Sequence, residues 1–459
     1  MSVYKTIAKN FAANSFGLGV NFLNQIAMVP LFITHWGVDK YADWILITAF
    51  STFFGMTDMG LNRASNNEFV IKYQQKDYLT CIKLQTNAFL FVLSVFAVFM
   101  IVSIFISVTW GFKDLLSVKV FSETETSVAF ILLLSEVFLT MYGRVYHGVF
   151  RATSRTHIAI VIDNVVRLAV LLILFFGIFF KIDLILLLIM YLIPTAAGIL
   201  FKHYYSTRIF DIKLSIENFD IGVFKSLIKP SLAFMMFPLG QAVSSQGLVF
   251  VVNTMLGPSV LVAFTTTRTL VNFLRQLMNM LSTSINPEIC AAYGRNDTRT
   301  MIDIYYRSLL VTFASTLASI IVLLFVGEFI YHEWTKGAII FNGAFFTGML
   351  FVLLVSCLWG MSSVIPLATN THERFTIAFL ISQVAGVALC FLLLKAYPRM
   401  ELIPSALVFT ELALFLYTLS ENNKFLNISF RKMYIELWLQ TKFLFLKGMQ
   451  MIHVVNYEK

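Results

Sequence analysis

Long apolar stretches separated by short polar loops fill nearly the whole chain. Each is close to the roughly 20 residues of helix needed to cross a hydrocarbon core about 30 Å thick. The first half contains six of them, at residues 14–34, 41–61, 85–109, 127–150, 158–180 and 184–203. The second half contains six more, at residues 231–254, 259–282, 308–326, 343–366, 375–395 and 402–420. We therefore predict an all-α polytopic membrane protein with twelve transmembrane helices.

The polar segments divide these helices into two bundles. Residues 1–203 form an N-terminal six-helix bundle, residues 204–230 a cytoplasmic linker, and residues 231–420 a C-terminal six-helix bundle. Residues 421–459 form a basic tail that also carries large apolar side chains. Two interpretations of this tail are open: an amphipathic helix on the inner membrane surface, or a partly ordered basic segment.

Lysines and arginines are concentrated in alternate loops. With the N-terminus inside, the inner segments carry about 23 basic residues and the outer loops about 7. Because cytoplasmic loops carry the excess of Lys and Arg in membrane proteins, we expect both termini in the cytoplasm. The formal net charge of +9 is thus interpreted as topology, and no nucleic-acid partner is expected.

Two short matches indicate that the second half repeats the first. Gly37, after the first stretch, corresponds to Gly257, after the seventh, at an offset of about 220 residues. Tyr142-Gly143 corresponds to Trp359-Gly360, and each pair precedes a similar Ala-Thr turn. Six crossings return the chain to its starting side, so both bundles have the same orientation. We expect a pseudo-two-fold axis along the membrane normal.

Composition excludes several other classes of protein. Of 459 residues, 58% are hydrophobic and only 13% are charged, whereas soluble domains have about 25% charged residues. The four scattered cysteines form no CxxC pair, so we expect neither a disulfide framework nor a metal site, and no cofactor. The chain contains no GxxxxGK[ST] phosphate loop, so ATP hydrolysis is not expected.

The eighth apolar stretch carries a polar stripe. Arg268, Asn272, Arg275 and Asn279 fall on one helix face roughly 60° wide. A charge at the membrane centre costs about 2.5–3.5 kcal/mol on insertion scales, so this face should point into the bundle or a wet cavity. The arginines either bind a ligand or form structural ion pairs.

Uncharged polar residues mark the first and seventh stretches. Asn21 and Gln25 share one face of the first stretch, and Gln241 belongs to a polar group in the seventh. Buried amides hydrogen-bond neighbouring helices or contact a hydroxyl-rich ligand, and both roles are open here.

The fourth and fifth stretches carry charges of both signs. Asp163 and Arg167 are one turn apart and either neutralise each other or face a ligand. Glu136 has no partner close in sequence, so Glu136 and Asp163 are candidate ion-coupling groups. Arg144, like the other intramembrane arginines, lies at mid-depth or toward the cytoplasm. Guanidinium binds phosphate in a bidentate fork, so an electropositive cavity for a pyrophosphate group is expected.

The run Asp58-Met59-Gly60-Leu61 at the end of the second stretch carries a resemblance. Together with the twelve-helix layout and the basic loop after it, the run resembles the polysaccharide transporter family. These are the Wzx-type flippases of O-antigen and capsule repeat units, in the multidrug/oligosaccharidyl-lipid/polysaccharide (MOP) exporter superfamily. The resemblance covers essentially the whole chain. Asp58, Gly60 and Leu61 are a landmark of this family without assigned chemistry.

This resemblance implies a substrate and a location. The substrate would be an oligosaccharide linked through pyrophosphate to undecaprenol, moved across the bacterial cytoplasmic (inner) membrane by alternating access, with other polysaccharide-assembly membrane proteins as partners. The candidate cavity cations are Arg144, Arg167, Arg268 and Arg275. The candidate polar contacts are Asn21, Gln25, Gln241, Asn272 and Asn279.

Two other functions remain open at this point. A drug or small-molecule exporter of the same superfamily would favour carboxylates in its cavity, to hold cations. A polysaccharide polymerase or ligase would need catalytic residues outside the membrane. The longest outer loop, at residues 110–126, is short and has no catalytic constellation. Without ATP hydrolysis, transport is expected to depend on an ion gradient.

Overall fold

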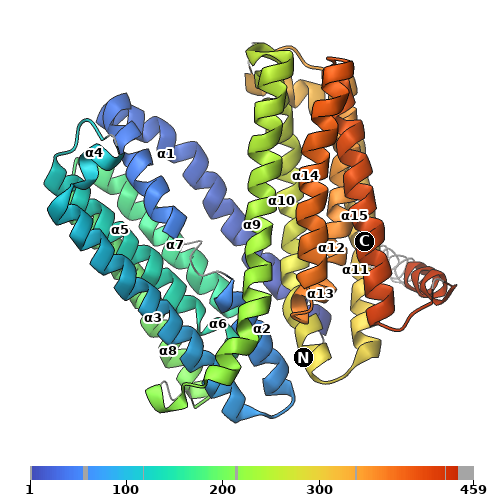
Figure 1. Ribbon diagram of the computed structural model, residues 1–459, viewed down its shortest axis with the longest axis horizontal. Helices are drawn as coiled ribbons and strands as arrows, with labels where there is room; N and C mark the ends of the chain where they lie inside the picture. The colour runs from blue at the N-terminus through green and yellow to red at the C-terminus, as the bar shows by residue number, and fades with distance from the viewer. Residues whose placement is uncertain are drawn as a thin grey trace, which may run out of the picture. The chain divides into compact units, whose positions relative to one another are not determined.

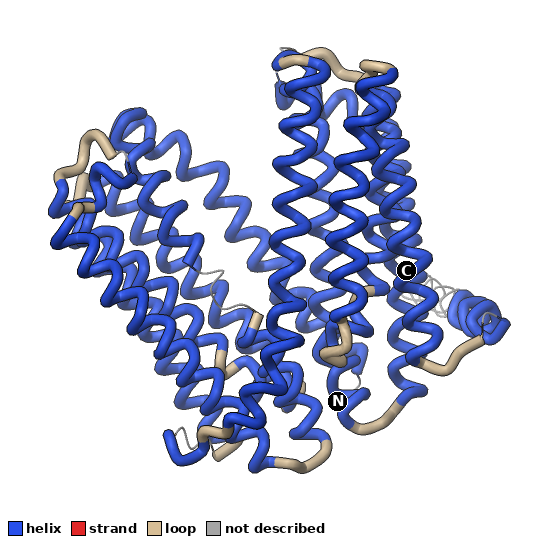
Figure 2. Tube along the Cα trace, in the orientation of Figure 1, coloured by secondary structure: helices blue, strands red, loops and turns tan. Residues whose placement is uncertain are grey.

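The computed structural model describes residues 3–54, 60–116, 118–211, 215–335, 337, 339–429 and 431–442. These residues form helices and connecting loops, with no β-strand among them (Figures 1 and 2). The chain divides into two compact units, Met1–Phe234 and Met235–Lys459, called unit 1 and unit 2 below. Each of the twelve predicted spans lies in or overlaps a helix, which confirms the all-α prediction.

The described part of unit 1 contains eight α-helices and the start of a ninth. They are α1 (Val3–Phe54), α2 (Leu61–Gln74), α3 (Tyr78–Thr109), α4 (Phe112–Leu116), α5 (Glu123–Arg144), α6 (His147–Ala152), α7 (Thr156–Phe179) and α8 (Leu184–Ile209). The α1 helix bends at Gly37, where the backbone is not helical. It therefore supplies two of the predicted spans.

Unit 2 contains the rest of α9 and the helices after it. They are α9 (Ile221–Leu256), α10 (Pro258–Gly294), α11 (Thr298–Thr335), α12 (Gly343–Ser362), α13 (Val364–Ala368), α14 (Glu373–Ala396) and α15 (Ile403–Phe425). Residues 431–442 form a further helix after α15, which we call the terminal helix. The rest of the predicted basic tail, residues 443–459, lies outside the described residues.

The chain is a multi-pass membrane protein. Nine helical segments in its described part are long and apolar enough to cross a membrane. The kinked α1 and the helix α10 are not among the nine, although their residues were predicted to span. For α10 the reason is visible in its sequence, because its polar stripe lowers the mean hydropathy. Because α1 supplies two predicted spans and α10 supplies one, these helices and the nine segments together account for the twelve predicted spans.

The two units repeat the same local backbone conformations. Gly37 has φ 80° and ψ 168°, and Gly257 has φ 84° and ψ 172°. Ser154 and Asn370, in the turns before α7 and α14, have φ of 57° and 56°. The positions proposed as equivalent from the sequence thus adopt equivalent conformations.

A third equivalence was missed in the sequence. The turn between α2 and α3 has Lys76 at φ 62° and the turn between α10 and α11 has Asn296 at φ 57°. In each turn the next residue is an aspartate that caps the following helix. Asp77 Oδ1 accepts a hydrogen bond from Thr80 N at 3.2 Å, and Asp297 Oδ1 accepts one from Thr300 N at 3.0 Å.

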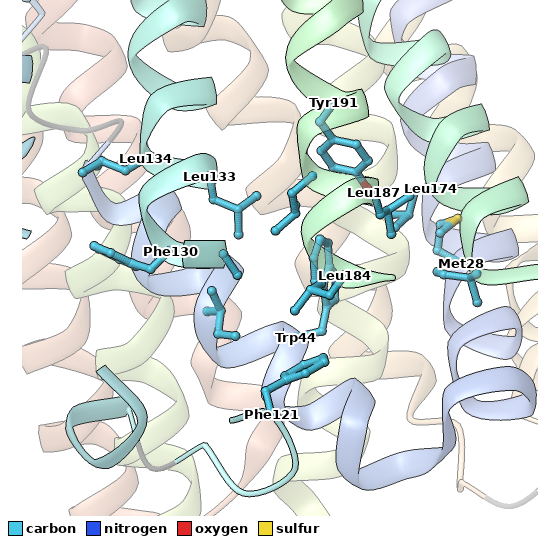
Figure 3. Packing of buried hydrophobic residues seen from close by; sticks show 14 of the residues in the cluster. Met28, Trp44, Phe121, Phe130, Leu133, Leu134, Leu174, Leu184, Leu187 and Tyr191 are labelled. Carbon is cyan, nitrogen blue, oxygen red and sulfur yellow. The ribbon is translucent and has the colours of Figure 1, made fainter. Parts of the chain in front are cut away.

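The core of unit 1 is an apolar cluster in which α1, α5, α7 and α8 meet (Figure 3). Trp44, Phe130, Leu187 and their neighbours are buried there. A loop closes one end of the cluster, because the buried carboxylate of Asp43 accepts hydrogen bonds from the backbone N–H groups of residues 119–121 at 2.9, 2.6 and 3.2 Å. Unit 2 has its own cluster, centred on α12.

Gly60 has a clear structural role. It adopts φ 71° at the start of α2, and a Cβ added there would lie 2.3 Å from Phe234 Cβ and 2.9 Å from the Ser231 carbonyl oxygen. Only glycine fits this left-handed, crowded position. Leu61 is the buried first residue of α2 rather than the end of a transmembrane span as predicted. Asp58 lies outside the described residues.

The predicted linker at residues 204–230 is mostly helical. It contains the end of α8, a short 3₁₀ helix at Ile216–Asn218 and the start of α9. Asp220 pairs with Lys83 at 2.8 Å and accepts hydrogen bonds from the first turn of α9. Much of this connection is therefore helical, and it is fixed to α3.

Candidate functional site

The polar stripe predicted on α10 lines a cavity of about 310 Å³ inside unit 2. Arg268, Asn272, Arg275 and Asn279 all border it, as the spacing indicated. Its other polar lining residues are Gln241, Ser244, Gln276, Gln383 and Glu411. Its apolar wall consists of Leu248, Met349, Val352, Trp359, Phe379 and Leu407. An apolar wall with a few convergent polar groups is typical of a ligand site.

The two arginines of this cavity are bonded differently. Arg268 Nη1 donates to the carbonyl oxygen of Ser245 on α9 at 3.1 Å. Arg275 Nε is buried and has no hydrogen-bond acceptor among the described residues. Leaving a buried donor unpaired costs about 1–3 kcal/mol, and more for a charged group. Arg275 is therefore suited to receive an acceptor from a ligand.

A carboxylate partly balances these arginines. Glu411 on α15 is buried, and it accepts hydrogen bonds from Trp359 Nε1 and, at 3.5 Å, from Gln383 Nε2. Two arginines and one glutamate give the cavity a formal charge of +1. With its carboxylate already bonded to two donors, the cavity is better suited to an anion than to a cation.

Unit 1 holds a second polar cavity, of about 180 Å³. Glu136, Arg144, Asp163 and Arg167, all predicted as site residues, line it together. Lys202 on α8 lines it as well. Three basic and two acidic side chains again give a formal charge of +1. The other lining residues are Thr140, Gly143, Val166, Val170, Thr195, Gly198 and Ile199.

Asp163 does not pair with Arg167, contrary to one of the two interpretations of the sequence. Its carboxylate pairs instead with Lys202 Nζ and, at 3.0 Å, with His147 Nε2. Lys202, inside the predicted span at residues 184–203, was not predicted as a site residue, yet it is buried within this network. The four-residue spacing could not show this, because the partners come from α6 and α8.

The other charges of this cavity are less constrained. Arg167 Nη1 donates to Asn21 Oδ1 on α1 at 3.0 Å, which joins two predicted site residues. Glu136 Oε1 accepts a hydrogen bond from Thr140 Oγ1 at 3.1 Å, one turn along α5. Gln25 lies in α1, but its side chain is outside the described residues. Glu136 is thus the acidic group here that is not held by a basic side chain within 4.0 Å among the described ion pairs.

The helix α2 positions the charged end of α5. The helical conformation is interrupted between α5, which ends at Arg144, and α6, which begins at His147. This interruption leaves backbone carbonyls at the end of α5 without helical donors. Asn62 Nδ2 donates to the Met141 carbonyl at 3.1 Å, and Asn66 Nδ2 donates to the Arg144 carbonyl at 3.0 Å. These amides satisfy the open end of α5 and fix the backbone that carries Arg144.

The unit 2 cavity has lining residues that were not predicted as site residues, among them Trp359, Gln383 and Glu411. Trp359 had been noted only for the repeat, Glu411 had no assignment, and Gln383 was not considered. Each carries a hydrogen-bonding group inside a long apolar span, and this signal was present in the sequence. The spacing along one helix could not group these three residues, because each of them lies on a different helix.

The sequence matches no protein-family model and no curated protein. Solved structures do share its fold. A multidrug resistance MATE family transporter of the MOP superfamily, in an outward-facing conformation, matches with a TM-score of 0.75 and 14% identity, over 93% of this chain and 96% of the other. MATE in the bent conformation gives 0.76 and 14%, over 93% and 97%.

A third structure differs in the description of its pocket. It is a MOP superfamily transporter from Pyrococcus furiosus, described as having a binding pocket of reverse polarity that suggests a different function. It matches with a TM-score of 0.71 and 15% identity, over 94% of this chain and 98% of the other. The chain therefore has the fold of MOP superfamily transporters over nearly its whole length.

Proposed function

We propose that this protein is a secondary transporter that flips undecaprenyl-pyrophosphate-linked oligosaccharide from the inner to the outer leaflet of the bacterial cytoplasmic membrane. The observation that carries the proposal is Arg275, whose Nε lies buried at an electropositive cavity and has no acceptor among the described residues. Arg268 borders the same cavity from the same helix face. A pyrophosphate group offers several oxygens to such a pair.

In this proposal the neutral amides have a separate task. Gln241, Asn272 and Asn279 border the same cavity as the arginines and would donate to and accept from sugar hydroxyls. The prenyl chain would remain in the lipid throughout, so no apolar part of the substrate would have to be exposed to water. Transport would proceed by alternating access driven by an ion gradient, with Glu136 as the candidate coupling group because its carboxylate is not committed to a basic partner.

A drug exporter of the same superfamily is the second candidate. The fold neighbours favour it at least as well as the flippase, because two of those named above are MATE transporters. Glu411 would then hold a cationic drug. Against this, the formal charge of the cavity is positive and Glu411 already accepts two hydrogen bonds. The description of the Pyrococcus furiosus transporter indicates that pocket polarity varies within this fold.

The decisive experiment measures translocation in proteoliposomes containing the full chain. Outward movement of undecaprenyl-pyrophosphate-linked oligosaccharide is read as sugar that becomes accessible to an added glycosidase. Losing a hydrogen bond to a charged group costs about 1.5–3 kcal/mol, so Arg275→Gln should slow translocation about 10- to 100-fold. Arg268→Gln should also slow it.

The matched control is Arg399→Gln, an exposed arginine between α14 and α15 that does not line this cavity. Its translocation rate should equal that of the wild type. Full activity in both cavity variants would remove the site assignment. Uptake of a cationic dye by a wild type that leaves the oligosaccharide in place would instead establish the drug exporter.

A further inference from the structure

The terminal helix at residues 431–442 buries two polar side chains against the protein. Met433, Glu436, Leu437 and Gln440 follow the i, i+3, i+4, i+7 spacing of one helix face. Glu436 is 4% exposed and Gln440 is 5% exposed. A helix that packs on a soluble body would bury its apolar side instead.

Specific polar contacts hold this inward face on the first turns of α11. Arg299 Nη1 lies 2.7 Å from Glu436 Oε1. Gln440 Oε1 accepts from Arg307 Nε at 2.9 Å, and Gln440 Nε2 donates to Asp303 Oδ1 at 2.9 Å. The three α11 residues are spaced by four, so they form a single stripe. The terminal helix is thus held in one register along α11.

The outward face is apolar and aromatic. Tyr434 is 72% exposed and Trp438 is 57% exposed, and Ile435 and Leu439 are exposed beside them. Basic side chains surround this apolar face: Arg431, Lys432 and Lys442. Lys442 Nζ lies 5.5 Å from the ring centroid of Trp438. The outward face therefore combines exposed aromatic rings with positive charge and, on this helix, no exposed acidic residue.

The start of the terminal helix is tied to the end of a membrane-spanning helix. Only five residues separate Phe425, the last residue of α15, from Arg431. Asn423 on α15 accepts a hydrogen bond from Tyr306 on α11 at 2.7 Å, and its Nδ2 lies 3.2 Å from Met433 Sδ. The terminal helix therefore begins close to the end of α15, a helix long and apolar enough to span a membrane.

We propose that the terminal helix is an interfacial anchor that binds the headgroups of anionic phospholipids. Trp438 and Tyr434 would enter the boundary between headgroups and acyl chains, which is where Trp and Tyr are enriched. The surrounding basic side chains would pair with lipid phosphates, as juxtamembrane basic clusters do. Because the inward face is bonded to α11, lipid binding would hold the end of unit 2 that includes Arg299 at the membrane surface. This proposal does not depend on the transported substrate.

A depth measurement on the full chain tests it. Ile435→Cys places one reactive thiol on the outward face, since the native cysteines are all buried. A fluorophore on this thiol is compared, in nanodiscs, with one at Glu217→Cys in the exposed 3₁₀ helix. Brominated phospholipid should quench the label at 435 about threefold more than the label at 217. Equal quenching at both positions would overturn the proposal.

The same label tests the lipid class. Quenching at 435 should increase when phosphatidylglycerol replaces part of the phosphatidylcholine. One juxtamembrane basic residue corresponds to about a fivefold change in surface binding, so Lys432→Gln with Lys442→Gln should abolish the increase. Lys76→Gln with Lys225→Gln, two exposed lysines of unit 1, is the control and should retain it. Cross-linking of two copies through position 435, without quenching, would show a protein contact instead and overturn the proposal.

Discussion

Arg268, Arg275 and Glu411 share one cavity, and the balance among these three side chains sets which sign of ligand the cavity attracts. Arginine remains charged under all accessible conditions. Glu411 accepts a hydrogen bond from Trp359 on one carboxylate oxygen and from Gln383 on the other. A glutamine in its place has nearly the same shape and keeps one acceptor oxygen. Removing its charge therefore changes the electrostatics of the cavity with little change in shape.

Glu411→Gln separates the two candidate functions by the direction of its effect. For a flippase of an anionic lipid, the formal cavity charge rises and binding of undecaprenyl pyrophosphate should tighten, by about tenfold for 1.4 kcal/mol. For an exporter of cations, drug binding should weaken by a similar factor. The measurement is ligand-induced thermal stabilisation in nanodiscs. Glu401→Gln, which changes an exposed carboxylate that does not line this cavity, should leave both affinities unchanged.

The two acidic residues of the unit 1 cavity should respond differently to amide substitution. Asp163→Asn leaves the buried Lys202 without its carboxylate, and breaking a buried ion pair costs about 3–5 kcal/mol. Glu136→Gln removes no ion pair and should leave the unfolding temperature close to that of the wild type. Transport by Glu136→Gln should lose its response to a pH gradient. An unchanged response would exclude Glu136 as the coupling group.

At the scale of single helices, the start of α2 is the most constrained point in unit 1. Gly60→Ala would place a Cβ against Phe234 and the Ser231 carbonyl in a left-handed backbone conformation. The expected loss of stability is about 1–3 kcal/mol, read as a lower unfolding temperature in detergent. Gly19→Ala on α1, where a Cβ would meet no atom within 4 Å, is the control and should not destabilise. Equal stability of the two variants would contradict this account of the glycine.

The aspartates that cap α3 and α11 should respond in the same way to substitution. Replacing Asp77 or Asp297 by Ala should cost about 1 kcal/mol each. Hydrogen bonding from Thr80 lowers the pKa of Asp77, and hydrogen bonding from Thr300 lowers that of Asp297. A lowered folded-state pKa adds stability above the unfolded value and loses it on acidification.

Replacing Asp77 or Asp297 by Asn keeps a capping oxygen but removes the charge. The difference in stability between each of these Asn variants and the wild type should therefore shrink as pH falls below about 4. Thermal unfolding across this range checks both sites. A difference that is independent of pH at either site would exclude a contribution from the ionised cap there.

The pattern of apolar and polar residues predicted most of the helices and the α10 side of the unit 2 cavity. The stripe on α10 could be found because its four residues lie on one helix and share one face. The partners of Asp163 could not be found in this way, because Lys202 and His147 lie on other helices and only tertiary packing brings them to Asp163. The helix α2 was not predicted for another reason. Its buried residues include the amides Asn62, Asn66 and Asn67, so it has no long apolar stretch to detect.

Across the whole molecule, two repeated units each enclose a cavity with a formal charge of +1. The positive charge is therefore not confined to one accidental cluster. The predicted cations Arg144 and Arg167 fall in one cavity and Arg268 and Arg275 in the other. This distribution supports an anionic ligand for the protein as a whole, which is the central claim of the proposed function.

The most direct measurement of that claim is ligand selectivity of the full chain in nanodiscs. The affinity for undecaprenyl pyrophosphate is compared with that for a long-chain quaternary ammonium of similar apolar length. We predict that the pyrophosphate lipid binds at least about tenfold more tightly, a difference of 1.4 kcal/mol. The preference should disappear when Arg268 and Arg275 are both replaced by Gln. Equal or tighter binding of the ammonium by the wild type would contradict the claim.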